Sequence, residues 1–243
     1  MGFIELFYPG LPKCPVCQRE FDHGKINLCD KCLDQIEFIK EDYCIECGKL
    51  IFSNQKICFD CKQNNHFFNK ARTVSVYEDG MKEYIKLFKY NKYRNLKEPL
   101  GDLLTIYIER FYNYKNFDYI TYIPVHETRL NERGFNQAYL LAKRVSINLR
   151  IPLISTLCRK EDTEKQSKLS RKERLLNLHN KFEIKLKRGL QSKKILLIDD
   201  IYTTGTTVDE ASKILLTEGV EDIKIITLAA GRDFELNQEF NKV

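Results

Sequence analysis

Apolar and polar positions alternate in a regular order along most of the chain beyond residue 66. Short runs with strict alternation or continuous apolar character predict strands, at 71–77, 119–125, 193–200 and 222–230. Apolar residues spaced three or four apart predict the intervening helices, at 80–90, 96–112, 135–148 and 207–218. Strands that alternate with helices form mostly parallel sheets covered on both faces, so we expect an α/β domain over residues 67–243.

The chain contains no pattern typical of export or membrane insertion. No apolar run approaches the roughly 18 residues that a membrane span requires. Residues 1–15 lack the basic start and the apolar length of a secretory signal. Because 43% of the residues are hydrophobic and 30% are charged, the composition is that of a folded globular protein. We therefore expect a cytoplasmic protein without a membrane span.

The first 66 residues carry eight of the nine cysteines, arranged in four Cys-x-x-Cys pairs. The pairs are Cys14 and Cys17, Cys29 and Cys32, Cys44 and Cys47, and Cys58 and Cys61. A reducing compartment does not maintain disulfides, whereas two such pairs complete a tetrahedral four-thiolate zinc site. We expect a small domain over residues 1–66 that holds two structural zinc ions. The short gaps favour sequential pairing, as in a tandem zinc ribbon, and leave an interleaved arrangement open.

The most distinctive chemistry lies at residues 195–207, which read ILLIDDIYTTGTT. An apolar strand delivers Asp199 and Asp200 to its carboxyl end, where open α/β sheets bind ligands. The small and hydroxylated residues that follow open a helix, and they are Thr203, Thr204, Gly205, Thr206 and Thr207. Backbone N–H groups and the helix dipole favour a phosphate at such a turn. Two carboxylates beside it suit sugar hydroxyls, so the motif predicts a site for a ribose 5-phosphate.

This motif resembles the phosphoribosyl pyrophosphate (PRPP) motif of type I phosphoribosyltransferases, an apolar strand followed by two acidic residues and a T-T-G-T-T loop. The resemblance implies that Asp199 and Asp200 contact the ribose hydroxyls. It also implies that residues 203–207 hold the 5′-phosphate. Thr203 stands where hypoxanthine-guanine members carry Asp, which argues against that purine-salvage class.

A narrower resemblance, to the ComF (ComFC) family, covers the whole chain. Its elements are the cysteine pairs, Leu87-Phe88-Lys89-Tyr90, Ile123-Pro124-Val125, Arg133-Gly134-Phe135-Asn136-Gln137 and the PRPP motif. Proteins of that family act in natural transformation and support the import of single-stranded DNA into the cytoplasm. The resemblance implies a type I phosphoribosyltransferase-like sheet preceded by a zinc ribbon. It implies PRPP, single-stranded DNA and a DNA-uptake or helicase protein as partners.

Phosphoribosyl transfer would also require a site for magnesium pyrophosphate, the leaving group. Magnesium takes oxygen ligands and keeps several waters, which suits a diphosphate and ribose hydroxyls near the acidic pair. We expect the pyrophosphate at the end of the 120–125 strand, a loop that the resemblance also implies. Its candidate ligands are the backbone of Val125 and His126 and the side chains of Arg129 and Arg133. Alternatively, both arginines belong to a solvated segment, and we expect a loop residue rather than a general base at His126.

Basic residues are concentrated after residue 158 in a chain whose formal net charge is +6. The segment Arg159–Arg174 (RKEDTEKQSKLSRKER) is polar and falls between predicted strands. In this fold a mobile lid would close there over PRPP, and its cations would equally contact a DNA backbone. A solvated charged loop is the remaining alternative. Cys158, the ninth cysteine, is expected to be a buried apolar residue.

Three functions agree with these features. The first is a PRPP-binding protein of the ComF type that serves DNA uptake, by phosphoribosyl transfer or by binding alone. The second is a nucleobase phosphoribosyltransferase of nucleotide salvage, which would need a base-recognition hood that the sequence does not reveal. The third is a nucleic-acid or protein adaptor that has lost catalysis, although the intact acidic pair argues against complete loss of ligand binding. Because the sequence does not name an acceptor, it leaves open whether the protein is an enzyme.

Overall fold

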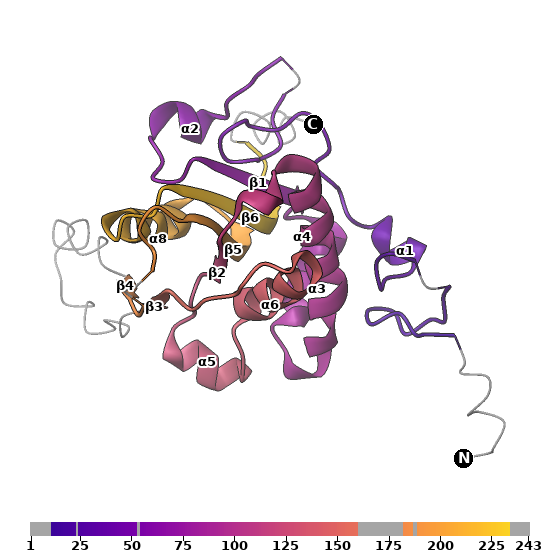
Figure 1. The fold of residues 1–243 in the computed structure, drawn as a ribbon. Helices are drawn as coiled ribbons and strands as arrows, with labels where there is room; N and C mark the ends of the chain where they lie inside the picture. Colours follow the sequence, from indigo (N-terminus) through magenta and orange to yellow (C-terminus); the bar gives the residue numbers. More distant parts are fainter. Residues whose placement is uncertain (1–10, 23, 53, 160–181, 187–188, 234–243) are drawn as a thin grey trace, which may run out of the picture.

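The computed structural model describes residues 11–233 except 23, 53, 160–181 and 187–188 (Figure 1). Its helices are α1 (Asp30–Leu33), α2 (Phe59–Gln63), α3 (Asp79–Phe88), α4 (Lys97–Phe111), α5 (Glu127–Arg133), α6 (Gln137–Leu149) and α8 (Thr206–Thr217). Two 3-10 helices are η1 (Asn91–Leu96) and η2 (Tyr114–Asn116). The strands are β1 (Lys70–Val76), β2 (Tyr119–Tyr122), β3 (Leu157–Arg159), β4 (Phe182–Ile184), β5 (Lys194–Tyr202) and β6 (Asp222–Ala230).

A parallel sheet with the strand order β1-β6-β5-β2 forms the centre of the molecule. Its strands coincide with the four predicted ones, which confirms the predicted mostly parallel α/β sheet. β5 and β6 lie in the middle, and their nearly continuous apolar runs are buried, as is usual where both faces are covered. β2 is shorter than predicted and ends at Tyr122, because Pro124 has no N–H to continue the ladder.

Helices cover both faces of the sheet and create two hydrophobic cores. On one face α3, α4 and α6 pack on Leu196 and Ile198, whereas on the other α8 packs on Ile195 and Leu197 (Figure 1). Successive residues of β5 therefore enter opposite cores, as the alternation of side chains along a strand requires. α3, α4, α6 and α8 each bury their apolar stripe, so the spacing of apolar residues in the sequence matches the spacing of buried residues in these four helices.

The cysteine-rich segment is divided between the two faces of this sheet. The first four cysteines lie with the α3, α4 and α6 core, and the second four lie with the α8 core. Residues 37–39 connect them along the outer edge of β1, where Ile39 N donates to the Val74 carbonyl (2.9 Å) and Val76 N donates to the Glu37 carbonyl (3.0 Å). This pairing covers an edge strand that would otherwise present unpaired backbone groups. The domain boundary at residue 66 stays a prediction, since both sides of it share both cores.

The structure also contains elements that the hydrophobic pattern does not predict. Helix α5 has no buried residue, so its sequence ETRLNER carries no apolar stripe to detect. The hairpin of β3 and β4 has only three residues in each strand, too few for an alternation signal. Within the cysteine-rich segment, the second cysteine pair of each set lies at the start of a short helix, with Cys29 as the N-cap of α1 and Cys58 as the N-cap of α2.

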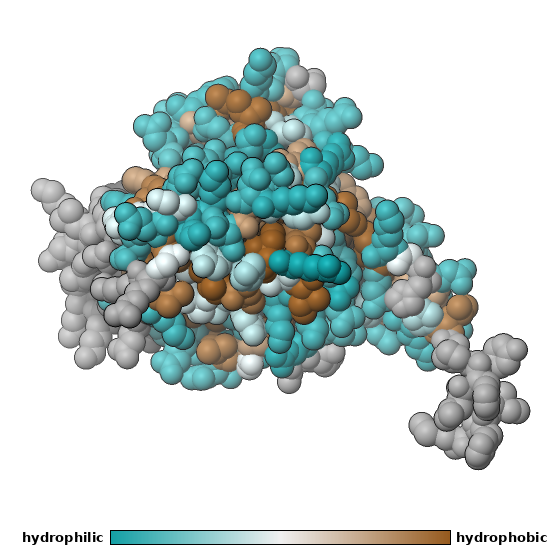
Figure 2. All heavy atoms as spheres, viewed as in Figure 1, coloured by the Kyte–Doolittle hydropathy of each residue, from teal (hydrophilic) through white to brown (hydrophobic). Residues whose placement is uncertain are grey.

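Hydrophilic residues cover most of the face shown in Figure 2, and apolar atoms show near its middle, over the region of β5 and β6. Within the described residues, no helix is both long and apolar enough to cross a bilayer.

Candidate functional site

Asp199 and Asp200 lie near the carboxyl end of β5, and both are partly buried. The strand continues to Tyr202 rather than ending at the acidic pair as predicted. The Asp200 amide donates to Asp199 Oδ1 (2.9 Å), which ties the first carboxylate to the strand. Burial raises the pKa of Asp199 well above its usual range, and the neighbouring Asp200 carboxylate raises that pKa further. A cation or hydroxyl donors at this position would therefore relieve an unfavourable charge.

The loop after β5 turns sharply into α8 at Gly205. This glycine is the N-cap of α8 and has a left-handed φ of 84°. A Cβ at Gly205 would collide with the Tyr202 ring, so only glycine fits the turn. Thr203, Thr204 and Thr206 are exposed, and the hydroxyls of Thr204 and Thr206 lie 2.9 Å apart. Among the described residues no side chain caps α8, so the first N–H groups of the helix remain for a ligand or for solvent.

The predicted pyrophosphate loop follows β2, which is the neighbour of β5 in the sheet. The Ile123 amide donates to the Ile198 carbonyl (3.0 Å), so the loop starts beside the acidic pair. His126 is the N-cap of α5 and its Nδ1 accepts from the Thr128 amide (3.2 Å). Arg129 is exposed on that helix, and Arg133 Nη1 donates to Gln137 Oε1 (3.1 Å). The structure thus gives His126 a capping contact, as expected for a loop residue.

Asn136 connects this loop to the start of α6, a role that the sequence analysis missed. Its Nδ2 donates to the Ile123 carbonyl (3.0 Å), and its Oδ1 accepts from the Tyr139 amide (3.2 Å) as the N-cap of α6. The neighbouring Phe135 is buried with its ring centroid 5.9 Å from that of Phe88. An Asn directly before a helical apolar pattern is an N-cap signal that could have revealed the capping contact. The bond to Ile123 depends on the tertiary fold.

A cavity of about 700 Å³ opens beside the same loop. Val125 and two tyrosines, Tyr122 and Tyr139, line it, and the tyrosine rings meet edge to face at 5.2 Å. Its cationic residues, from three separate elements or loops, are Arg94, Arg159 and Lys185. Sequence patterns did not identify these side chains as one group, because Arg94 lies in η1, Arg159 in β3 and Lys185 directly after β4, and these positions are far apart in the sequence. Arg159 is the first residue of the predicted basic segment, and residues 160–174 of that segment lie outside the described residues.

Cys158 also lines this cavity, and the prediction that it is buried is wrong. Its side chain is partly exposed on β3, and its Sγ lies 3.6 Å from the Glu183 carbonyl. The reason is that β3 pairs only with β4 in a two-stranded hairpin, which does not cover the cysteine on both sides.

The eight paired cysteines form two clusters of four in sequential order. One cluster contains Cys14, Cys17, Cys29 and Cys32, and the other contains Cys44, Cys47, Cys58 and Cys61. Sulfur–sulfur distances are 3.8 Å for Cys14 and Cys32 and 3.5 Å for Cys47 and Cys58. A tetrahedral zinc site with Zn–S bonds of about 2.3 Å separates its sulfurs by about 3.8 Å. Both clusters therefore fit zinc, sequential pairing is confirmed, and the interleaved arrangement is excluded.

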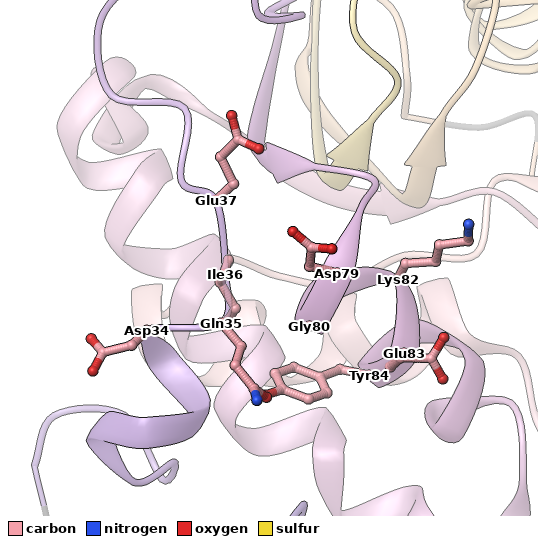
Figure 3. Close-up of a pocket in the computed structure, with 9 residues that line it drawn as sticks. All are labelled: Asp34, Gln35, Ile36, Glu37, Asp79, Gly80, Lys82, Glu83 and Tyr84. Carbon is pink, nitrogen blue, oxygen red and sulfur yellow. The ribbon is translucent and has the colours of Figure 1, made fainter. Parts of the chain in front are cut away.

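A cavity of about 850 Å³ lies away from the acidic pair, between the end of α1 and the start of α3 (Figure 3). Four carboxylates line it together with a single lysine: Asp34, Glu37, Asp79, Glu83 and Lys82. A phosphate ligand needs cations or N–H donors, so this cavity does not fit the predicted ligand. Tyr84 closes its inner side with a hydroxyl 2.9 Å from the Cys32 carbonyl.

Comparison with protein families gives two matches along the chain. A double zinc ribbon domain matches residues 3–62, and a phosphoribosyl transferase domain matches residues 132–243. A purine phosphoribosyltransferase structure from Pyrococcus horikoshii is 19% identical, with a TM-score of 0.36 over 54% of this chain and 73% of that chain. The assignment of the fold depends on the family match and the strand order rather than on this distant superposition.

Curated relatives match 79–90% of the chain. Competence protein F of Haemophilus influenzae is 30% identical over 89% of this chain and 96% of its own length. Competence protein ComFC of Bacillus subtilis is 32% identical over 79% of both chains. DNA utilization protein YhgH of Escherichia coli is 27% identical over 90% of this chain and 96% of its own length. With a double zinc ribbon, a phosphoribosyl transferase domain and these relatives, the chain belongs to the ComF (ComFC) family of competence proteins.

Proposed function

We propose that the protein binds PRPP together with magnesium at the junction of β5 and α8. The observation that carries this proposal is the junction itself, where two carboxylates precede an exposed threonine loop and a helix start that no side chain of the described residues caps. In this proposal Asp199 and Asp200 bind the ribose hydroxyls. The 5′-phosphate lies in the loop that follows, against the hydroxyls and N–H groups of Thr203, Thr204, Gly205, Thr206 and Thr207.

In this proposal magnesium binds together with the diphosphate of PRPP. The preferred ligands of magnesium are oxygens, and burial together with the neighbouring Asp200 carboxylate raises the pKa of Asp199, so a cation there would stabilise the charged form. The pyrophosphate lies along the loop after β2, where the backbone of Val125 and His126 donates N–H groups. Arg129 and Arg133 supply the cations in this proposal, Arg129 from an exposed position and Arg133 from the last turn of α5.

We infer that this site serves natural transformation in the cytoplasm. The names of the relatives, competence protein and DNA utilization protein, support this role. The basic segment Arg159–Arg174 supports contact with single-stranded DNA, because each neutralised phosphate strengthens binding. A DNA-uptake or helicase protein is the second partner in this proposal. PRPP binding alone would be enough for a ligand-dependent role in DNA uptake, and phosphoribosyl transfer would add an acceptor.

One observation favours a nucleobase phosphoribosyltransferase as the second candidate. The cavity of about 700 Å³ beside Val125 is lined by Tyr122 and Tyr139, whose rings could stack on an aromatic base. In that case, incubation with PRPP, magnesium and the common nucleobases would release pyrophosphate. If the protein binds PRPP but releases no pyrophosphate, the result favours the first candidate function, PRPP binding in DNA uptake.

Calorimetric titration of the zinc-loaded protein with PRPP and magnesium tests the first proposal. We expect saturable binding in the wild type and its loss in an Asp199→Asn/Asp200→Asn variant, which has nearly the same volume. Circular dichroism of both proteins controls for folding. If a folded wild type does not bind PRPP, the proposed ligand is wrong.

A salt series tests contact with DNA separately from PRPP. A variant with Arg171→Ala, Lys172→Ala and Arg174→Ala should bind a single-stranded oligonucleotide more weakly and with a flatter salt dependence. The log–log slope should fall by about 0.7 for each DNA phosphate that the protein no longer neutralises. The matched control removes three lysines in and directly after α3, which are Lys82, Lys86 and Lys89. Equal effects in both variants would show only a general effect of net charge.

A further inference from the structure

His66 connects the second zinc cluster to the start of α8, although the residues before it have the composition of a polar linker. Its Nε2 lies 3.2 Å from Cys61 Sγ, and its Nδ1 lies 2.8 Å from Asp209 Oδ2. The other oxygen of Asp209 accepts from the Phe67 amide (2.9 Å). Asp209 belongs to the first turn of α8, where its own amide donates to the Gly205 carbonyl (2.9 Å). A continuous chain of contacts thus leads from the Cys61 thiol to Gly205, in the loop at 203–207.

A second route reaches the other end of the same loop through aromatic packing. The His66 ring stacks on Phe68 with centroids 4.5 Å apart and planes inclined by 15°. Phe68 meets Tyr202 edge to face at 6.4 Å, and Tyr202 is the residue before Thr203. The Tyr202 ring also occupies the space beside Gly205 that a Cβ would need. Residues on both sides of the loop are therefore held by the segment that follows Cys61.

The first zinc cluster lies on the opposite face of the sheet and provides an internal comparison. Its cysteines pack with α3 and α4 rather than with α8. The corresponding hydrogen bond there joins the Tyr84 hydroxyl to the Cys32 carbonyl at 2.9 Å. Within the described residues, neither Tyr84 nor Cys32 has a hydrogen bond to Asp199, Asp200 or the loop at 203–207.

We infer that His66 and Asp209 are positioning residues through which the second zinc site sets the geometry of the loop at 203–207. The tetrahedral site would orient Cys61, His66 would transmit that orientation, and Asp209 would hold the first turn of α8. The part of this inference that concerns PRPP rests on the function proposed above. By thermodynamic reciprocity, zinc in the second site would strengthen binding at the loop, and a ligand at the loop would retain that zinc.

Hydrogen exchange of the zinc-loaded full chain tests the inference without any ligand. His66→Phe keeps an aromatic ring beside Phe68 and removes both hydrogen bonds. Asp209→Asn removes the negative charge and leaves one acceptor oxygen where the carboxylate serves both His66 and the Phe67 amide with two. We expect both variants to exchange faster in the peptide that covers residues 203–209. Tyr84→Phe, the control at the first cluster, should leave that peptide unchanged. Unchanged exchange in both test variants, with zinc content equal to wild type, would overturn the inference.

Ligand binding and zinc release give the second readout. His66→Phe should weaken PRPP binding by roughly 5- to 150-fold, the usual range of coupling between sites. It should also weaken zinc retention against a chelating dye by roughly 10- to 100-fold, as loss of a hydrogen bond to a metal ligand does. Saturating PRPP should slow zinc release from the wild type and not from the variant. A wild type that does not bind PRPP would refute the proposed function, whereas a wild type that binds PRPP with the same affinity as His66→Phe would refute the role of His66.

Discussion

Among single residues, Asp199 combines a functional position with an unfavourable charge. Its folded-state pKa lies above the unfolded value, so the folded state binds more protons and stability falls as pH rises above about 4. Asp199→Asn removes the charge and keeps the oxygen that accepts from the Asp200 amide. We expect a higher Tm at pH 7, by roughly 2–4 °C for each kcal/mol relieved, and little change at pH 4. A lower Tm of the variant at pH 7 in calorimetry would contradict this assignment.

Gly205 is the residue at which backbone conformation and close packing act together. Gly205→Ala meets both a left-handed φ of 84° and the Tyr202 ring. We expect a loss of about 1 kcal/mol or more in unfolding free energy together with the loss of PRPP binding. Gly189→Ala is the matched control, since Gly189 has a φ of 80° and no atom of the described residues within 4 Å of its Cβ position. It should lose stability and retain PRPP binding, which denaturant unfolding and calorimetry together would measure.

Among the helices and strands, the start of α6 positions the loop after β2. Asn136→Ala removes an N-cap and the bond to the Ile123 carbonyl, so we expect a loss of about 0.5–2 kcal/mol and weaker PRPP binding. The control is Asn148→Ala in the last turn of the same helix, where Nδ2 donates to Asp102 (2.8 Å) and Thr105 (3.0 Å). It should lower stability without changing PRPP affinity. Equal PRPP affinity in both variants would refute the positioning role of Asn136.

The elements that sequence patterns predicted correctly share a simple property. β5, β6 and α4 are long and bury one stripe or both faces, so burial imposes a clear period on their residues. Helix α5 buries no residue, and β3 is three residues long, so neither leaves such a pattern. The elements that were missed nevertheless line the proposed pyrophosphate loop and the cavity beside it.

In the molecule as a whole, the zinc ribbon is part of the cores on both faces of the sheet. The second cluster shares a core with α8, and residues 37–39 cover the edge of β1. A fragment of residues 67–243 would expose both surfaces, so we expect it to lose cooperative thermal unfolding. The full chain after zinc removal by a chelator should show a similar loss, because each site contributes on the order of 10 kcal/mol to folding. A fragment that unfolds cooperatively at the Tm of the full chain would instead support independent domains.

Motifs that consist of a few consecutive residues are determined by the sequence alone. Cys-x-x-Cys spacing, the apolar strand with its acidic pair and the T-T-G-T-T turn each occupy a few consecutive residues, so their chemistry is evident directly. The hydrophobic periodicity likewise predicts the main strands and helices. The cores then follow in outline, because the residues that show a period are the residues that become buried.

Contacts between residues that are far apart in the sequence, in contrast, depend on the tertiary structure. His66 and Asp209 are 143 positions apart, and their contact depends on where β1 and α8 lie around the sheet. The division of the zinc sites between two faces and the bond from Asn136 to Ile123 depend on the same arrangement. Local propensity carries no information about strand order, so contacts across the sheet are set by packing of the complete fold.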